Sequence, residues 1–217
     1  MKYKIKWQYK GAKTESILLE SEWASDDVIE TLMNDFLKTG RTVDLSIVDE
    51  MANEWTKKEF LKLKNITENE PENIMIYFDG GFDLQTRLSG IGMVIYYDKG
   101  GKSYRLRAND QLTELESNNE AEYAALYNAV VLLEGLNIKP IPCTIRGDSH
   151  GLLKQLTGEW PCLEQNLNRW LDRIEEKINK LGIKPLYEPI TRKQNKEADQ
   201  LASQALKNIL VNSHIEL

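Results

Sequence analysis

The sequence predicts an α/β protein in which a mixed sheet is flanked by helices and preceded by a small α+β domain. Three strand-like segments follow one another in the middle of the chain, and helical and strand-like segments then alternate towards its end. Consecutive strands with short connections form a meander, whereas the alternation adds further strands and packs helices on the sheet. A separate set of short elements precedes a polar stretch at residues 65–73, which indicates a second domain.

The N-terminal domain is expected to cover residues 1–64. Its first segment, residues 2–10, alternates aromatic or aliphatic residues with lysine or glutamine, a period of two that is typical of a half-buried strand. The further expected elements are strands at 16–20 and 42–48, a helix capped by Ser25 and stopped by Gly40, and a helix from Thr56 to Leu63 that a capping-box pattern opens. The polar run at 65–73 is the expected linker.

The second domain is expected at residues 74–210. The expected strands are 74–78, 91–98, 103–109, 143–146 and 185–190. The expected helices are 118–136, 151–156, 163–181 and 196–210. Ligands of open α/β sheets bind outside the carboxyl ends of the strands, so residues that directly follow these strands are the first candidates for a site.

Composition excludes several classes of protein. Of the 217 residues 41% are hydrophobic, and we find neither a signal peptide nor an apolar run of the about 20 residues that span a bilayer, so no membrane partner is expected. Cys143 and Cys162 make no disulfide framework, which predicts a cytoplasmic protein. His150 and His214 lack the spacing of a zinc site. The net charge of −6 argues mildly against tight, non-specific binding of nucleic acid but leaves local basic patches open.

Four acidic side chains stand in short motifs that follow or open a regular element. Asp79 ends a strand in IYFDGG, and Asp148 ends another in TIRGDSHG. Glu122 in SNNEAEY and Asp199 in NKEADQLA lie in the first turns of helices. Each position also has an ordinary structural explanation: a strand-to-turn aspartate, a helix N-cap, a solvated glutamate at the rim of the sheet, and an acid favoured by the helix dipole. If the fold brings the four together, their repulsion needs a compensating cation, and carboxylate oxygens suit Mg²⁺ or Mn²⁺ and not zinc.

In their order along the chain these motifs resemble the type 1 ribonucleases H, within the larger ribonuclease H-like fold. The resemblance covers residues 74–210. It implies a five-stranded mixed sheet in which the strands before Asp79 and Asp148 are parallel neighbours. It also implies that Asp79, Glu122, Asp148 and Asp199 are the catalytic residues and bind two Mg²⁺ or Mn²⁺ ions.

The activity implied by the resemblance is that of a divalent-metal-dependent endoribonuclease, which hydrolyses the RNA strand of RNA/DNA hybrids and leaves 5′-phosphate ends. Selectivity for RNA would rest on its 2′-hydroxyl group. The expected substrate-binding residues are Gly80, Gly81, Asn118, Asn119, Ser149, Arg192 and Asn195. Among these, Asn118 and Asn119 match the family's pair of asparagines before the catalytic glutamate, where such residues contact the RNA strand.

The sequence departs from the family in two places. The loop at 189–194 contains no histidine, and Arg192 cannot shuttle protons at neutral pH. The family's basic protrusion is replaced by a short link at 157–161, where Trp160 either stacks on a base or packs between helices. Two alternatives therefore stay open: a weakly active or inactive ribonuclease H-fold protein that binds nucleic acid or serves as an adaptor, and a nuclease for another substrate such as double-stranded RNA.

The N-terminal domain does not resemble the family's small hybrid-binding domain, so its role and any protein partner stay open. Its lysine face consists of Lys2, Lys4, Lys6 and Lys10. These lysines could follow phosphates, or they could form a solvated face that protects the edge of a sheet.

Overall fold

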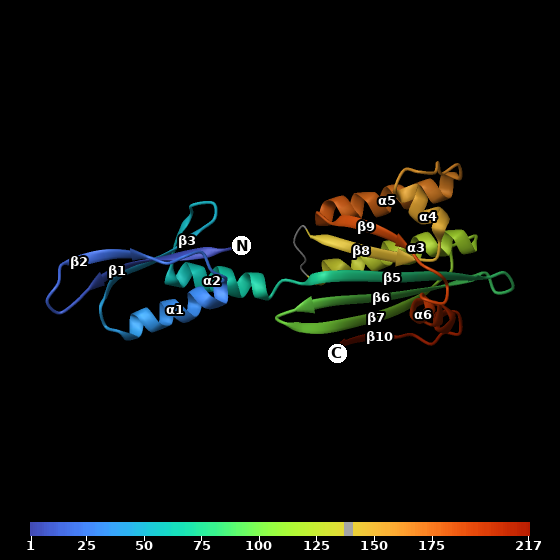
Figure 1. The fold of residues 1–217 in the computed structure, drawn as a ribbon. Helices are drawn as coiled ribbons and strands as arrows, with labels where there is room; N and C mark the ends of the chain where they lie inside the picture. The colour runs from blue at the N-terminus through green and yellow to red at the C-terminus, as the bar shows by residue number, and fades with distance from the viewer. Residues whose placement is uncertain (137–140) are drawn as a thin grey trace. The chain divides into compact units, whose positions relative to one another are not determined.

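The computed structural model describes residues 1–136 and 141–217, which divide into two compact units, Met1–Asn69 and Glu70–Leu217 (Figure 1). Each unit has its own sheet and its own hydrophobic core. The stretch outside regular elements between them is shorter than the expected linker, since a helix continues to Glu68 and a strand begins at Glu72. Among the described residues, no helix combines the length and the apolar character needed to span a membrane.

The N-terminal unit is a four-stranded antiparallel sheet with two helices, and its strands lie in the order β2-β1-β3-β4. The elements are β1 Tyr3–Lys10, β2 Ser16–Glu20, α1 Asp26–Lys38, β3 Thr42–Asp49, β4 Glu54–Thr56 and α2 Lys57–Glu68. The period of two expected for the first strand is confirmed, because Tyr3 and Ile5 are buried in one core with Ile29 and Met33 of α1 and Phe60 of α2. The three-residue β4 was not expected, since it is too short to show a period.

The helices of this unit begin where the sequence predicted. At α2 both halves of the capping box are present: the Thr56 side chain accepts from the N–H of Glu59, and the Glu59 carboxylate accepts from the N–H of Thr56. α1 begins directly after Ser25, but the Ser25 side chain makes no capping hydrogen bond.

Two of the four lysines of the lysine face lie beside acidic side chains. Lys4 Nζ lies 2.7 Å from a carboxylate oxygen of Glu20, and Lys6 Nζ lies 3.7 Å from one of Glu54. Lys4 also lies over the ring of Trp23, 5.5 Å from its centroid. Because neighbouring acids neutralise these two lysines, the structure favours a solvated face over a surface that follows phosphates.

The C-terminal unit contains a six-stranded mixed sheet in the order β10-β7-β6-β5-β8-β9. The strands are β5 Glu72–Asp83, β6 Leu88–Lys99, β7 Lys102–Leu112, β8 Pro142–Gly147, β9 Lys184–Pro189 and β10 Asn212–Glu216. β5, β6 and β7 form the expected antiparallel meander, and β8 pairs in parallel with both β5 and β9. The strands that precede Asp79 and Asp148 in the sequence motifs are therefore parallel neighbours.

The two faces of this sheet are covered by different helices (Figure 1). The elements are α3 Asn118–Glu134, α4 His150–Leu156 and α5 Gln165–Leu181 on one face, and α6 Lys196–Leu206 on the other. Successive residues of a strand point to opposite faces. Met93 and Ile95 of β6 accordingly belong to the main core, whereas Val94 packs against Ala198 and Leu201 of α6.

The last helix ends earlier than expected, and this changes the number of strands from five to six. α6 stops at Leu206, and Asn208 then takes a positive φ of 57°, the left-handed conformation that often closes a helix. The following residues form β10, which pairs antiparallel with β7, His214 lying opposite Leu106. β10 was not predicted, because its sequence is largely polar and the prediction relied on apolar periodicity.

Candidate functional site

Asp79 and Asp148 come from neighbouring parallel strands. In the β5–β8 pairing Tyr77 lies opposite Arg146, and the same register continued by two residues sets Asp79 beside Asp148. Asp79 is buried within β5, whereas Asp148 directly follows β8 and is half-buried. The two carboxylates thus lie where the parallel strands β5 and β8 run towards their carboxyl ends, the region in which open α/β sheets bind ligands.

Glu122 reaches the same place from α3 because Gly80 lets the helix approach β5. A Cβ atom on Gly80 would lie 2.2 Å from the carbonyl carbon of Ala121 and 2.3 Å from the backbone nitrogen of Glu122, so no larger residue fits. The backbone of Gly80 also hydrogen-bonds to the buried Glu122 carboxylate. The start of α3 is fixed by Ser117, whose Oγ accepts from the N–H of Glu120 at 3.1 Å.

Asn195 joins the start of α6 to β5 and to Asp148, which directly follows β8. Its Nδ2 donates to Asp148 Oδ1 at 2.7 Å and to the backbone carbonyl of Phe78 at 2.9 Å. The residue is only 1% exposed. The sequence led us to expect a substrate contact from Asn195; because its side chain is buried, its role in the structure is to position Asp148 next to β5.

Asp199 lies in the first turn of α6 and is paired with Arg192, whose Nη2 lies 2.9 Å from Asp199 Oδ1. α6 approaches the sheet closely because β6 contains Gly90 and Gly92. A Cβ atom on either glycine would lie 2.2 Å from a backbone carbonyl oxygen of α6. Sequence reasoning missed these two glycines; the available signal was their spacing of two within a strand, facing a helix with alanines four residues apart.

Burial and mutual repulsion raise the pKa values of two of these carboxyls. The pKa of Asp79 is raised to about 7, first because burial desolvates its charged form and then because Asp148 and Asp199 repel it. The pKa of Glu122 is raised to about 9, again by burial first and then by Asp79 and Asp148. The four acidic side chains therefore form one electrostatically linked group.

The chemistry of this group fits a divalent cation. Glu122 Oε2 is buried and has no hydrogen-bond partner, so it lacks the compensation that burial of a polar atom normally requires. The four side chains offer carboxylate oxygens only, which suits Mg²⁺ or Mn²⁺ better than a softer metal. A bound cation would offset the desolvation and the mutual repulsion that raise the pKa values of Asp79 and Glu122.

A tighter acidic group lies elsewhere in the part of the chain that the structure describes. Asp26, Asp27 and Glu68 of the N-terminal unit bring one oxygen each within 4.8 Å of one another, which the four site carboxylates do not. Lys64 Nζ lies 2.7 Å from Asp27, 2.5 Å from Glu30 and 3.5 Å from Glu68. Because this ammonium group already supplies the positive charge, the cluster is an ion-pair network and not a metal centre. The wider spacing at the site is what repulsion between uncompensated carboxylates favours.

The other residues expected to bind substrate lie around the carboxylates. Asn118 Oδ1 accepts from the N–H of Phe82 at 3.2 Å and so ties α3 to β5. Gly81 faces α6, since a Cβ atom there would lie 3.3 Å from a methyl carbon of Leu206. Asn119 is exposed and Ser149 is half-buried, and within the described ranges neither side chain has a hydrogen-bond partner. Of this set, Asn119 and Ser149 are free to contact a ligand.

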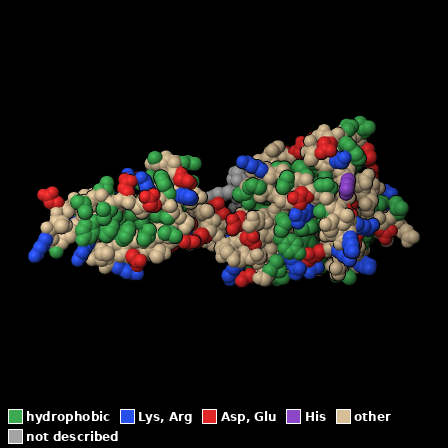
Figure 2. Space-filling view, viewed as in Figure 1, with side chains coloured by type: hydrophobic (Ala, Val, Ile, Leu, Met, Phe, Trp, Pro, Cys, Tyr) green, Lys and Arg blue, Asp and Glu red, His purple; other side chains and the backbone are tan. Residues whose placement is uncertain are grey.

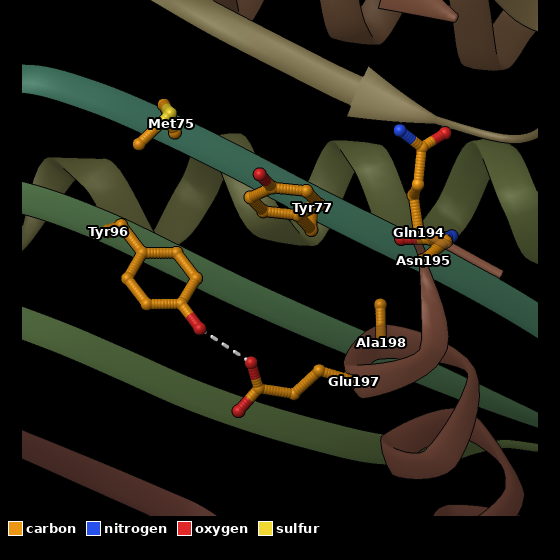
Figure 3. A pocket seen from close by; sticks show the side chains of 7 residues that line it. All are labelled: Met75, Tyr77, Tyr96, Gln194, Asn195, Glu197 and Ala198. Atoms are coloured by element: carbon orange, nitrogen blue, oxygen red, sulfur yellow. Dashed lines mark hydrogen bonds between the residues drawn. The ribbon is translucent and has the colours of Figure 1, made fainter. Parts of the chain in front are cut away.

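A cavity of about 270 Å³ lies on the α6 side of the sheet, and none of the four acids lines it (Figure 3). Its lining residues are Met75, Tyr77, Tyr96, Gln194, Asn195, Glu197 and Ala198. Tyr96 donates to Glu197 at 2.6 Å, and Glu197 Oε1 also lies 3.2 Å from both Arg105 and Arg107. Asn195 alone is shared between this cavity and the carboxylate group.

Residues 77–205 match the protein family described as reverse transcriptase-like. The chain belongs to this family. One relative is similar over both units. The uncharacterized protein YpeP of Bacillus subtilis is 41% identical over 213 residues, which cover 98% of this chain and 93% of YpeP.

Ribonucleases H1 of known structure are similar to the C-terminal part of this family member. The enzyme of Halobacterium salinarum is 29% identical with a TM-score of 0.55, and the match covers 62% of this chain and 98% of that one. LC11-RNase H1, crystallised in complex with an RNA/DNA hybrid, is 27% identical with a TM-score of 0.56 and a coverage of 63% and 98%. In sequence, ribonuclease HI of H. salinarum is 31% identical over 130 residues, or 60% of this chain and 62% of that protein. The C-terminal unit is thus a ribonuclease H-like domain that resembles type 1 ribonucleases H, and the N-terminal sheet is an addition to it.

Proposed function

We propose that this chain is a cytoplasmic, divalent-metal-dependent endoribonuclease that hydrolyses the RNA strand of RNA/DNA hybrids and leaves 5′-phosphate ends. The observation that carries the proposal is the convergence of Asp79, Glu122, Asp148 and Asp199 at the strand ends, with raised pKa values at the two buried members. The similarity to LC11-RNase H1, which was crystallised with such a hybrid, supports the choice of substrate.

In this proposal the four carboxylates hold Mg²⁺ or Mn²⁺. Asp79 and Glu122 are the strongest candidates, because they are buried next to each other without full compensation. When bound, such ions stabilise charge on the phosphodiester and lower the pKa of an attacking water. The chain itself keeps the acids together, through the contact of α3 with Gly80 and the amide of Asn195 that holds Asp148.

The RNA strand is proposed to lie across the starts of α3 and α4. Asn119 and Ser149 offer side chains that are free to hydrogen-bond there, and Arg192 places a cation at the rim. Hydrogen bonds to 2′-hydroxyl groups would then favour RNA over DNA.

Cleavage of an end-labelled RNA/DNA hybrid with Mg²⁺, Mn²⁺ or EDTA tests this proposal. The full chain should cut the RNA strand only with a divalent ion, and Asp79→Asn should abolish cutting while the chain still shows a cooperative thermal transition. Asp83→Asn is a matched control, because Asp83 lies on the same strand but its carboxylate serves a turn, accepting from the N–H of Gln85 at 2.8 Å. Cutting by Asp79→Asn would contradict the assignment. A double-stranded RNA substrate in the same assay tests the alternative that the chain is a nuclease for double-stranded RNA.

The ion pair between Arg192 and Asp199 favours a second candidate function, which is binding of the hybrid without efficient cleavage. One of the four carboxylates is already neutralised by a guanidinium group, and the loop at 189–194 offers no histidine. The same assay separates the two functions, since retention of the hybrid on a filter without cleavage in Mn²⁺ would support the binding role.

A further inference from the structure

The N-terminal sheet ends in a short edge strand with an apolar centre and a single charged residue, Glu20, at its end. β2 is the outer strand next to β1, and all five of its residues are exposed. Its three central side chains, Ile17, Leu18 and Leu19, are 49%, 57% and 42% exposed. Edge strands of natural sheets are usually blunted by charged side chains, above all lysine, by proline or by a bulge; β2 has no lysine, proline or bulge, and only Glu20 at its end is charged. An edge with three central apolar residues is a surface on which another strand can pair.

In β2 the backbone N–H and C=O groups of every second residue point away from the sheet. Trp7 of β1 lies opposite Leu19, and the same register extends to Ile5 and Ser21, where the N–H of Ser21 donates to the Ile5 carbonyl at 3.0 Å. Because hydrogen-bonded positions alternate along an antiparallel pair, the odd-numbered residues of β2 direct their N–H and C=O groups towards β1. The residues that direct theirs outwards are Ser16, Leu18 and Glu20.

We propose that β2 pairs with β2 of a second copy of this chain, antiparallel and about a twofold axis at Leu18. In this register Leu18 faces the partner subunit's Leu18, and Ser16 faces the partner subunit's Glu20. All outward-directed backbone groups of one strand then meet those of the other, and the two sheets become one continuous sheet. No other register satisfies all three outward-directed residues of both strands at once.

The side chains of β2 suit the same register. Leu19 lies on the face of the sheet that carries the helices, since it is opposite Trp7, which stacks on Phe36 of α1 with ring centroids 4.2 Å apart. The twofold axis sets Ile17 opposite the partner subunit's Leu19 on that face, and the two Leu18 side chains together on the other. The central cross-strand pairs are then apolar, Ile17 with the partner subunit's Leu19 on one face and Leu18 with the partner subunit's Leu18 on the other, and the Ser16–Glu20 pairs flank the Leu18 pair. Figure 2 shows hydrophobic side chains gathered over β1, β2 and the adjoining end of α1.

Charge does not oppose this pairing. Glu20 is the one charged residue of β2, and Lys4 Nζ lies 2.7 Å from its carboxylate. In the twofold register Glu20 faces a serine and not a second carboxylate, so no like charges are brought opposite each other. A strand of five residues buries less than the about 800 Å² per partner of a standard interface, so we expect a weak dimer whose population rises with concentration.

Sedimentation velocity on the full chain across the micromolar range tests the proposal. The wild type should shift from monomer to dimer as its concentration rises, and Leu18→Lys should stay monomeric. Leu18→Pro should also stay monomeric, because it removes an outward N–H without touching a hydrogen bond to β1. Leu186→Lys is a matched control, since Leu186 is 56% exposed on β9, the edge strand of the other sheet, and this variant should dimerise like the wild type. A wild type that stays monomeric, or a dimer that survives both Leu18 variants, overturns the proposal.

Disulfide cross-linking tests the register itself and does not depend on nuclease activity. Cys143 is buried and Cys162 is half-buried, so the background is Cys162→Ser. Oxidation should join two copies of Leu18→Cys, because residues facing each other on the axis lie about 5.5 Å apart at Cα, within the reach of a disulfide. Two copies of Ile17→Cys would lie about 8 Å apart, beyond that reach, and should not join. Equal cross-linking at both positions overturns the twofold register.

Discussion

Glu122→Gln is expected to stabilise the chain in the absence of metal at neutral and alkaline pH. The Glu122 carboxyl is buried, its Oε2 has no hydrogen-bond partner, and burial followed by repulsion from Asp79 and Asp148 raises its pKa from 4.5 to about 9. Glutamine keeps the shape and the acceptor that the backbone of Gly80 uses, but it carries no charge that must be desolvated. The same change removes a proposed cation ligand, so stability and activity should move in opposite directions.

The magnitude follows from the pKa. A carboxyl whose pKa is higher in the folded than in the unfolded chain keeps its proton longer in the folded chain, here between about pH 4.5 and about pH 9. The wild type therefore loses stability relative to the glutamine variant as pH rises through this window. At about 1.4 kcal/mol per pKa unit, the difference reaches about 5 kcal/mol at about pH 8. For a chain of this length that corresponds to a Tm difference on the order of 10 °C.

Scanning calorimetry in EDTA at about pH 5 and about pH 8 measures this difference. The Tm of the variant should exceed that of the wild type slightly at the lower pH and strongly at the higher one, and Mg²⁺ should raise the Tm of the wild type more than that of the variant. Glu114→Gln is the matched control, because Glu114 is exposed in the loop before α3. A Tm difference that is the same at both pH values would refute the reasoning that ionisation of Glu122 destabilises the fold.

Three further changes test the packing and the charges of the two units. Gly92→Ala should lower the free energy of unfolding, measured in urea, by about 1–3 kcal/mol, because its Cβ would lie 2.2 Å from a carbonyl oxygen of α6. Gly151→Ala is the control, since the space around Gly151 is open and the change should be neutral or stabilising. Equal losses in the two variants would contradict the close packing of α6. Asn195→Ala should lower the free energy of unfolding by about 1–3 kcal/mol, because Asp148 loses its hydrogen-bond donor. The same change should weaken Mn²⁺ binding in calorimetric titration. Unchanged Mn²⁺ binding would argue against the role of Asn195 in positioning Asp148. Lys64→Met should destabilise the N-terminal unit in a tryptophan-fluorescence melt, since the carboxylates around it lose their shared ammonium group, and high salt should restore part of the loss. A loss that salt does not change would point to packing instead.

Local patterns were sufficient to predict the class of the fold and most of its elements. The alternation of β1 gave its buried face, because a period of two reports directly which side chains share a face of a sheet. The capping box at Thr56 gave the start of α2, because capping is a contact between residues three apart. The end of α2 was placed too early, since its polar last turns carry no apolar stripe.

The members of the candidate site could also be named from the sequence, but their environments could not. Asp148 follows a strand, and Glu122 and Asp199 lie near the starts of helices, positions that can be read from the chain. Asp79 was expected directly after a strand, but β5 continues past it to Asp83. That Glu122 is buried with an unpaired oxygen depends on how closely α3 approaches Gly80. That Asn195 holds Asp148 instead of facing substrate depends on a contact between residues 47 positions apart.

The sequence by itself thus determined the order of the elements, the faces that they bury and the positions of the acids, because these properties are set by neighbours along the chain. The tertiary structure alone decided the sixth strand, the exposed edge of β2 and the raised pKa values of Asp79 and Glu122. These depend on backbone pairing and on desolvation, which arise only when distant segments exclude water from one another.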